Sequence, residues 1–189
     1  DFRKMTSPIY MDTYYKMFKD LIEHSVDTTG KKSVIISHGL GCRLTLLFFN
    51  YFLEKKLGVE GCQLWKNKYI KIWIPVSGQF AGTPKSVRIA MHGDNEGMGI
   101  KCITYGSNKW YWDVEKLLSG VLWGFPDSYV FKNLKIVKYD GKYYTPDDYQ
   151  EYLTKSGNKE AINAIEETIH PIRKFSLFPP RVKTHAIIG

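Results

Sequence analysis

The sequence predicts an α/β fold, with a mostly parallel sheet and flanking helices. Two β-branched runs, residues 33–37 and 69–77, are separated by a long stretch that is apolar almost all round. Such a stretch is typical of a buried helix, and a strand, a helix and a second strand in this order favour parallel pairing through a right-handed crossover. At 189 residues the chain is long enough to bury a core.

The first expected element is an amphipathic helix that begins at Asp12 and ends near Gly30. Asp12 is a good N-cap, and apolar side chains recur behind it at helical spacing. Residues 33–37 should then form a short strand buried on both faces. A turn containing Gly39 and Gly41 leads into the buried helix, expected over residues 42–57, before the second strand.

Further along the chain the pattern loosens. Residues 93–111 are glycine-rich without periodicity and are expected to form a long loop. Asp140 and Gly141 separate two strand-like runs, which is a strong hairpin signal. Helices are expected over 146–155, capped by Thr145 and Pro146, and over 159–169. The final segment, residues 181–189, resembles another core strand.

Composition excludes several classes of protein. No run approaches the ~20 apolar residues of a membrane-spanning helix. The three cysteines make no CxxC motif and the five histidines lack metal-ligand spacing, so we expect no metal site and no cofactor. The net charge of +8 comes from lysines scattered among acids, with no arginine–aromatic block that would indicate nucleic acid. These lysines are either a solvated surface or an attraction to anionic lipid headgroups.

The segment "SHGLG", residues 37–41, has the layout of a nucleophile elbow, the sharp strand-to-helix turn that exposes a catalytic serine. Gly39 holds the nucleophile position, Ser37 and Gly41 are the small flanking residues, and His38 and Leu40 stand between them. Glycine cannot attack a carbonyl, but it adopts a strained backbone at little cost, so we expect a positive φ at Gly39. Ser37 is a poor substitute nucleophile because it lies at the strand's end. Taken alone, the motif also fits a glycine-rich turn without chemistry.

A series of longer motifs extends along nearly the whole chain. They are "DFR" (1–3), "VIISHGLGC" (34–42), "WKNKYI" (65–70), "PVSGQFAGTPKSV" (75–87), "GDNEGMGI" (93–100), "YYTPDDYQEYL" (143–153) and "PPRVKTHAIIG" (179–189). In this order and spacing they resemble the lecithin:cholesterol acyltransferase family, which includes lysosomal phospholipase A2 and phospholipid:sterol or diacylglycerol acyltransferases. The resemblance includes the thiol of Cys42, which follows the second elbow glycine.

The resemblance implies an α/β-hydrolase core with a cap. Residues 1–92 would be the core with its elbow, 93–180 the lid and cap, and 181–189 a returning core strand. A mobile lid would fall at about 96–117, where the aromatic side chains either contact a lipid surface or pack onto the cap: Tyr105, Trp110, Tyr111 and Trp112. The implied substrate is a phospholipid or other acyl lipid at a membrane or lipoprotein surface, in a secretory, lysosomal or other membrane-associated compartment. The absence of N-x-S/T sequons disfavours an extracellular location.

The chain departs from the family pattern where the chemistry lies. Gly39 replaces the serine, Ser37 the first elbow glycine, and Phe80 a tryptophan. The resemblance places the first oxyanion donor before Asp1 and the acid and base after Gly189, so an internal fragment is expected. Only the Leu40 N–H, the second oxyanion donor, would remain. None of the histidines matches a catalytic histidine of the family: His24, His38, His92, His170 and His185.

Two functions therefore stay open. One is a relative without catalysis, serving as a scaffold, a lipid-binding protein or a structural subunit with protein partners. The other is an active phospholipase A or O-acyltransferase that works through an acyl-serine intermediate and is represented by a partial chain or a nucleophile mutant. An unrelated binding domain is disfavoured by the series of motifs.

Overall fold

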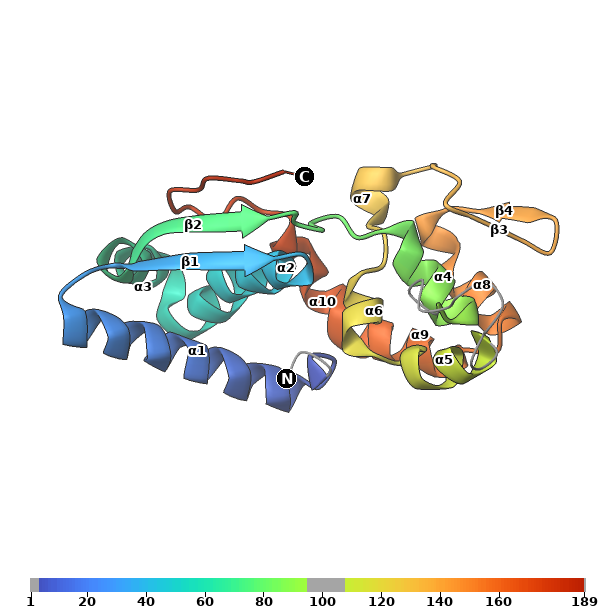
Figure 1. Ribbon diagram of the computed structural model, residues 1–189, viewed down its shortest axis with the longest axis horizontal. Helices are drawn as coiled ribbons and strands as arrows, with labels where there is room; N and C mark the ends of the chain where they lie inside the picture. Colours follow the sequence, from blue (N-terminus) through green and yellow to red (C-terminus); the bar gives the residue numbers. More distant parts are fainter. Residues whose placement is uncertain (1–3, 95–107, 189) are drawn as a thin grey trace, which may run out of the picture. The chain divides into compact units, whose positions relative to one another are not determined.

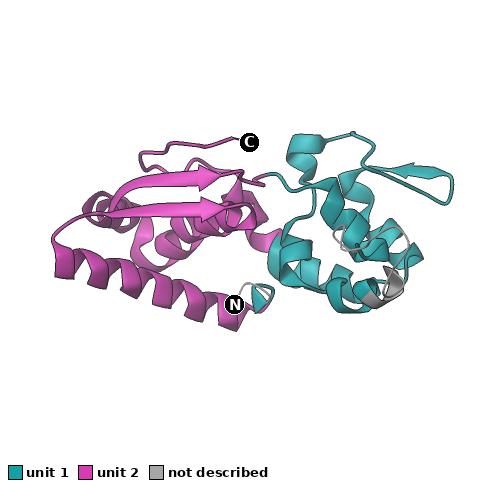
Figure 2. Ribbon diagram, in the orientation of Figure 1, with its two compact units in different colours: residues 1–6, 81–169 teal, residues 7–80, 170–189 magenta. Residues whose placement is uncertain are grey.

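The computed structural model describes residues 4–94 and 108–188. The chain divides into two compact units, coloured separately in Figure 2: unit 1 comprises residues 1–6 and 81–169, and unit 2 residues 7–80 and 170–189. These boundaries differ from those expected near residues 92 and 180. The chain returns to unit 2 early because Asn50 Nδ2 donates hydrogen bonds to the carbonyls of Phe175 (3.0 Å) and Phe178 (2.8 Å). The assignment of these parts as core, lid and cap stays a prediction.

Unit 2 contains a parallel pair of strands and helices packed on it (Figure 1). In chain order it holds α1 (Pro8–Thr29), β1 (Ser33–His38), α2 (Leu40–Leu47), a π-helical turn (Phe48–Phe52), α3 (Leu53–Tyr69), β2 (Ile70–Val76), α10 (His170–Arg173) and a 3₁₀ turn (Lys174–Ser176). The parallel pairing of β1 with β2 confirms the prediction made from the strand–helix–strand order.

The last described segment extends this sheet on the far side of β2. The Trp73 N–H donates to the Lys183 carbonyl (2.9 Å), and the His185 N–H donates to the Trp73 carbonyl (3.0 Å). The segment pairs only through isolated parallel bridges at Thr184 and Ile187, and Ile187 is 54% exposed. The segment therefore lies parallel to β2 with few strand contacts, and its place as a core strand stays a prediction.

The prediction that β1 is buried on both faces is wrong. Helices α1, α2 and α3 lie on one side of the strands (Figure 1), where Ile35 is buried. On the other face Val34 is 48% and Ile36 69% exposed, so the described residues of unit 2 cover this face only in part. A β-branched run indicates a strand, but the number of covered faces depends on which layers pack on it.

Helix α1 begins earlier than expected. Ser7 is the N-cap, its Oγ accepts a hydrogen bond from the Tyr10 N–H (3.4 Å), and Pro8 occupies the first helical position. Serine followed by proline is a stronger start signal than Asp12, which becomes a residue of the helix. The predicted end is confirmed at Gly30, whose φ of 65° permits the left-handed C-cap.

The buried helix is interrupted rather than continuous. A π-helical turn separates α2 from α3, and α3 is kinked at Gly58 (φ 70°, ψ 173°). The π-helical turn places the fully buried Phe48 among aromatic rings of α1 and α3. Its ring centroid lies 4.8 Å from that of Phe18 and 5.8 Å from that of Trp65. Each such pair contributes ~0.5–1.5 kcal/mol beyond area burial, so the cluster fixes α1 and α3 beneath the sheet.

Unit 1 is mainly helical with one hairpin. It holds α4 (Pro84–His92), α5 (Asn108–Glu115), α6 (Ser119–Trp123), α7 (Ser128–Phe131), β3 (Val137–Tyr139), β4 (Lys142–Tyr144), a 3₁₀ turn (Pro146–Asp148), α8 (Tyr149–Lys155), α9 (Lys159–Ala164) and a π-helical turn (Ile165–Ile169). The hairpin at Asp140–Gly141 and both late helices are confirmed. The expected loop over 93–111 lies mostly outside the described residues, although α5 occupies its end. Among described helices, none has the length and hydropathy of a membrane span.

Candidate functional site

The turn between β1 and α2 is the candidate site. Gly39 has φ 53° and ψ −122°, which confirms the predicted positive φ. Its N–H donates to the Val76 carbonyl (3.0 Å), and its carbonyl accepts a hydrogen bond from the Cys42 N–H (3.2 Å). The chain therefore leaves the sheet and enters the helix within one residue. This is the backbone that a nucleophile elbow requires.

The space around the turn also fits an elbow. A Cβ placed on Gly39 would meet no atom within 4 Å, so a side chain at this position would point into open space. A Cβ on Gly41 would lie 3.9 Å from the Ser37 Cβ, which is ordinary van der Waals contact. A side chain at the nucleophile position would therefore be accessible, but the residue there is glycine and has no hydroxyl.

Ser37 is engaged elsewhere. Its Oγ accepts a hydrogen bond from the indole Nε1–H of Trp73 (2.7 Å) on the neighbouring strand. An indole is a donor only and cannot remove a proton from a hydroxyl. Ser37 therefore links β1 to β2 through this hydrogen bond, and the bond does not activate its hydroxyl as a nucleophile.

Cys42 has a structural position as well. The thiol is buried and donates to the carbonyls of Ser37 (3.2 Å) and Val76 (3.7 Å), so it joins the ends of both strands to the first turn of α2. Of the described histidine, cysteine and acidic side chains, none form a cluster that could hold a metal ion.

The first turn of α2 has no side-chain cap, because its N-cap is Gly39. Its leading N–H groups, that of Leu40 first, carry the positive end of the helix dipole and are suited to a developing negative charge.

The Gln79 N–H also contacts the elbow, because it donates a hydrogen bond to the Gly39 carbonyl (3.4 Å). Sequence reasoning missed Gln79; the only signal was its place in the "SGQFAG" motif.

The loop after β2 lies beside the elbow. The Phe80 ring packs against Gly78, where a Cβ would come within 2.5 Å of the ring, and its centroid lies 6.0 Å from that of Trp73. Phe80 stands where the resembled family has tryptophan, and it keeps an aromatic contact there. His38, next to Gly39, is exposed at the end of β1.

The lid aromatics have different positions. Tyr105 lies outside the described residues, as does the side chain of Trp110. Tyr111 is half-buried, and Trp112 donates its indole N–H to the Ala90 carbonyl of α4 (2.8 Å). The Lys116 ammonium lies 4.3 Å from the Trp112 ring centroid. Trp112 is thus packed within unit 1, as in the packing alternative, while the lipid-contact role stays a prediction.

A second polar cluster lies away from the elbow on α3. Burial raises the pKa of the Cys62 thiol and lowers that of the neighbouring Lys66 ammonium. Lys66 Nζ donates to the Pro180 carbonyl (2.9 Å), beside a groove of about 460 Å³. The lysine of the "WKNKYI" motif therefore ties α3 to the segment after α10.

Comparison with known proteins gives a consistent picture. The family model for lecithin:cholesterol acyltransferase matches residues 1–177. A bovine (Bos taurus) lysosomal phospholipase A and acyltransferase is 24% identical over 93% of the chain, and a chicken (Gallus gallus) phosphatidylcholine-sterol acyltransferase 27% identical over 93%. A phospholipid:diacylglycerol acyltransferase of Schizosaccharomyces pombe is 35% identical over 44% of the chain. The chain covers 40%, 39% and 13% of these relatives, respectively.

Proposed function

Because the chain belongs to the lecithin:cholesterol acyltransferase family, we propose that it carries the elbow of a lipid acyl-transfer protein from which the nucleophile is missing. The remaining role is that of a scaffold or lipid-binding protein, with a phospholipid or related acyl lipid as the ligand. The observation that carries this proposal is the backbone of Gly39, which keeps the strained elbow geometry at a position without a hydroxyl.

The family mechanism explains what is lost. A serine at the elbow attacks the acyl ester, a histidine held by an acidic residue moves the proton, and two N–H groups hold the oxyanion. In this chain the Leu40 N–H would supply one of those donors, and Ser37 bonds to an indole in place of a base. Without the hydroxyl no acyl-enzyme forms, and activity falls by several orders of magnitude.

A fluorophosphonate probe tests this proposal, because it reacts covalently with an activated serine. The purified protein should remain unlabelled under conditions that label a serine lipase. Peptide mass spectrometry of the native protein across residues 33–62 should find glycine at position 39. A labelled serine anywhere in the chain, or a serine at position 39 of the native protein, would overturn the proposal.

The alternative is an active phospholipase A or O-acyltransferase in which position 39 is natively serine. The open space beyond the Gly39 Cα favours it, because a serine would fit without a clash. The native residue at position 39 and the activity of the native protein separate the two. Serine at that position, together with acyl release from phosphatidylcholine vesicles by the native protein, would support the alternative. Glycine at that position, with no acyl release, would support the main proposal.

A further inference from the structure

We propose that the outer face of the β3–β4 hairpin and the segment leading into it form a docking surface for an anionic lipid bilayer. The surface consists of Lys132, Lys135, Lys138 and Tyr143, with exposed apolar side chains at Tyr129, Val130 and Leu134. In Figure 1, α7 and the hairpin, joined by the segment that holds Lys132, Leu134 and Lys135, lie along one edge of unit 1. The inference rests on the proposed lipid role only for its choice of partner.

The strand register defines the outer face. Lys138 is the cross-strand partner of Tyr143, so both side chains lie on the same face of the hairpin. The ammonium groups of Lys135 and Lys138 lie 5.0 and 5.3 Å from the Tyr143 ring centroid. Both lysines are therefore gathered over one ring that is itself 51% exposed.

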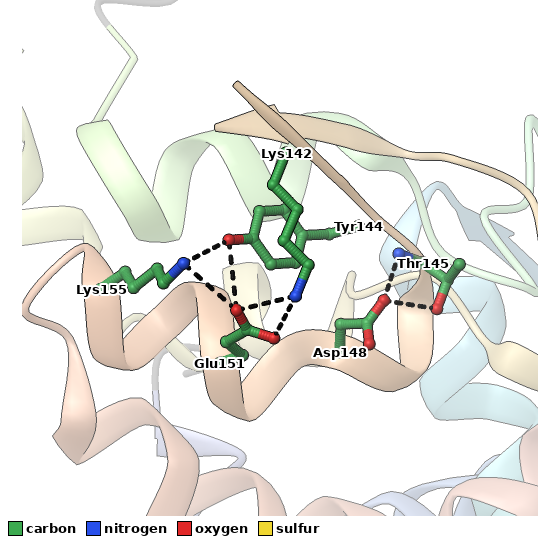
Figure 3. Close-up of polar contacts among 6 residues, drawn as sticks. All are labelled: Lys142, Tyr144, Thr145, Asp148, Glu151 and Lys155. Carbon is green, nitrogen blue, oxygen red and sulfur yellow. Dashed lines mark hydrogen bonds and ion pairs between the residues drawn. The ribbon is translucent and has the colours of Figure 1, made fainter. Parts of the chain in front are cut away.

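The opposite face of the hairpin is fixed to α8. Tyr144 is fully buried and its hydroxyl accepts a hydrogen bond from Lys155 Nζ (3.0 Å), while Lys142 forms an ion pair with Glu151 (2.7 Å), as Figure 3 shows. Hydrogen bonds from Lys142 and then Lys155 hold the pKa of Glu151 below its ordinary value. With this face anchored, the lysines of the other face are held outward.

The segment before the hairpin is exposed and apolar as well as basic. Tyr129 is 79% exposed and Leu134 56%, and Val130 between them is also exposed. Single exposed apolar residues are ordinary, but here they alternate with lysines over one short stretch. An interfacial membrane anchor combines apolar side chains, which insert into the bilayer, with lysines, which contact the lipid phosphates. This segment has both.

Lys132 gives an independent observation. Its backbone has φ 43° and ψ −121°, a conformation that is strained for any residue other than glycine. Glycine would relieve that strain and keep the turn. A lysine in this place is consistent with a use for its side chain, which is exposed beside the other two lysines in sequence.

Charge decides the kind of partner. From Ser128 to Tyr143 the only acidic residue is Asp140. Within the described part of the chain, neither Lys132, Lys135 nor Lys138 forms an ion pair with a carboxylate. Lysines act as point charges for lipid phosphates, and each adds roughly fivefold to the binding of an anionic membrane. Nucleic acid is less suited, because residues 128–143 contain no arginine and expose aliphatic side chains, Val130 and Leu134, beside their lysines.

Vesicle sedimentation tests the inference. The probes are vesicles of phosphatidylcholine alone and of phosphatidylcholine mixed with phosphatidylserine. The wild-type protein should prefer the anionic vesicles, and more salt should weaken that preference. The triple change Lys132→Gln, Lys135→Gln and Lys138→Gln should lower the partition coefficient on the order of a hundredfold. The double change Tyr129→Ser and Leu134→Ser should weaken binding to both kinds of vesicle.

A matched control removes the same charge elsewhere. Lys16, Lys31 and Lys32 are exposed lysines of unit 2, and changing them together to glutamine should alter anionic vesicle binding little. Circular dichroism melts would verify that both triple variants are folded. Equal losses in both triple variants, an unchanged hairpin variant, or tighter wild-type binding to single-stranded RNA than to vesicles would each overturn the inference. Serine labelling by the fluorophosphonate probe needs no vesicles, so the two proposals can fail separately.

Discussion

Gly39 and Gly41 flank the same leucine but differ in backbone conformation. Gly39 lies in the left-handed region with open space beyond its Cα, whereas Gly41 is helical with the Ser37 Cβ nearby. We therefore expect Gly39→Ala to lower the free energy of unfolding by about 1–3 kcal/mol through backbone strain alone. Gly41→Ala should be close to neutral, because alanine favours a helix and the contact is ordinary.

Urea titrations of the two glycine variants measure the difference. A Gly39→Ala variant as stable as the wild type would mean that the turn relaxes out of the left-handed region in solution. A large loss for Gly41→Ala would show that β1 and α2 are packed more tightly at this point than the structure has them.

The bond between Ser37 and Trp73 gives a second expected outcome at the residue scale. Ser37→Ala leaves the buried Trp73 indole N–H without its acceptor, which should cost about 1–3 kcal/mol. Trp73→Phe removes the donor but also buried ring area. A double-mutant cycle isolates the shared bond, and its coupling energy should be about 0.5–1.5 kcal/mol. A coupling energy near zero would contradict the hydrogen bond.

These residues also show what spacing can and cannot predict. The position and the sign of φ at Gly39 followed from the motif, because an elbow is made by a few consecutive residues. The partners of the elbow did not, because Trp73 and Gln79 reach it only through the pairing of two distant strands. No local pattern marks such a contact.

At the scale of elements, local chemistry again decided which predictions succeeded. The hairpin turn follows from Asp140 and Gly141, both of which have positive φ (49° and 74°). Thr145 and Asp148 form a capping box at the following 3₁₀ turn. The start of α1 was misplaced because two capping signals compete there. The burial of β1 was misjudged because it depends on distant layers.

The capping box carries a pH-dependent prediction. Hydrogen bonds from the backbone N–H and then the hydroxyl of Thr145 hold the pKa of Asp148 below its ordinary value. A carboxyl with a lowered folded pKa adds stability that is complete above its unfolded pKa near 4 and is lost as pH falls through the folded value. We expect Asp148→Ala to cost about 1 kcal/mol at neutral pH and progressively less below about pH 4.

Denaturant titrations of wild type and the Asp148→Ala variant across this pH range provide the measurement. Asp147→Ala, which removes the exposed carboxylate next to Asp148 in the same turn, is the control for a general charge effect. A stability difference that grows as pH falls would have the wrong sign for a capping carboxylate.

At the scale of the whole molecule, the chain makes two compact units, and the second interrupts the first in sequence order. The boundaries of these units, at residues 80/81 and 169/170, differ from the divisions at 92 and 180 that the motifs predict for core, lid and cap, and that assignment stays a prediction. The later boundary differs because residues 170–180 join unit 2 through side-chain bonds to buried positions on α2 and the π-helical turn, such as that from Arg43 Nε to Ser176 Oγ (3.0 Å). A boundary set by such contacts has no marker in local composition.

This division predicts two centres of hydrogen-exchange protection. In unit 2 the slowest amides should belong to Leu47, Phe48 and Phe49, all fully buried. In unit 1 they should belong to Tyr152 and Leu153, which are also within the core. Native-state exchange followed by mass spectrometry should find both centres. Protection confined to one unit would contradict two independently packed cores.

The outer strand of the sheet has a practical consequence. Among described residues β1 pairs only with β2, and it exposes Val34 and Ile36 next to a groove of about 550 Å³ that α1 shares. A β-branched, unpaired edge is a template for further strands and therefore promotes aggregation. Preparations of this chain should lose soluble protein when they are concentrated. The change Ile36→Lys should delay that loss, because a charge on an edge strand opposes strand addition.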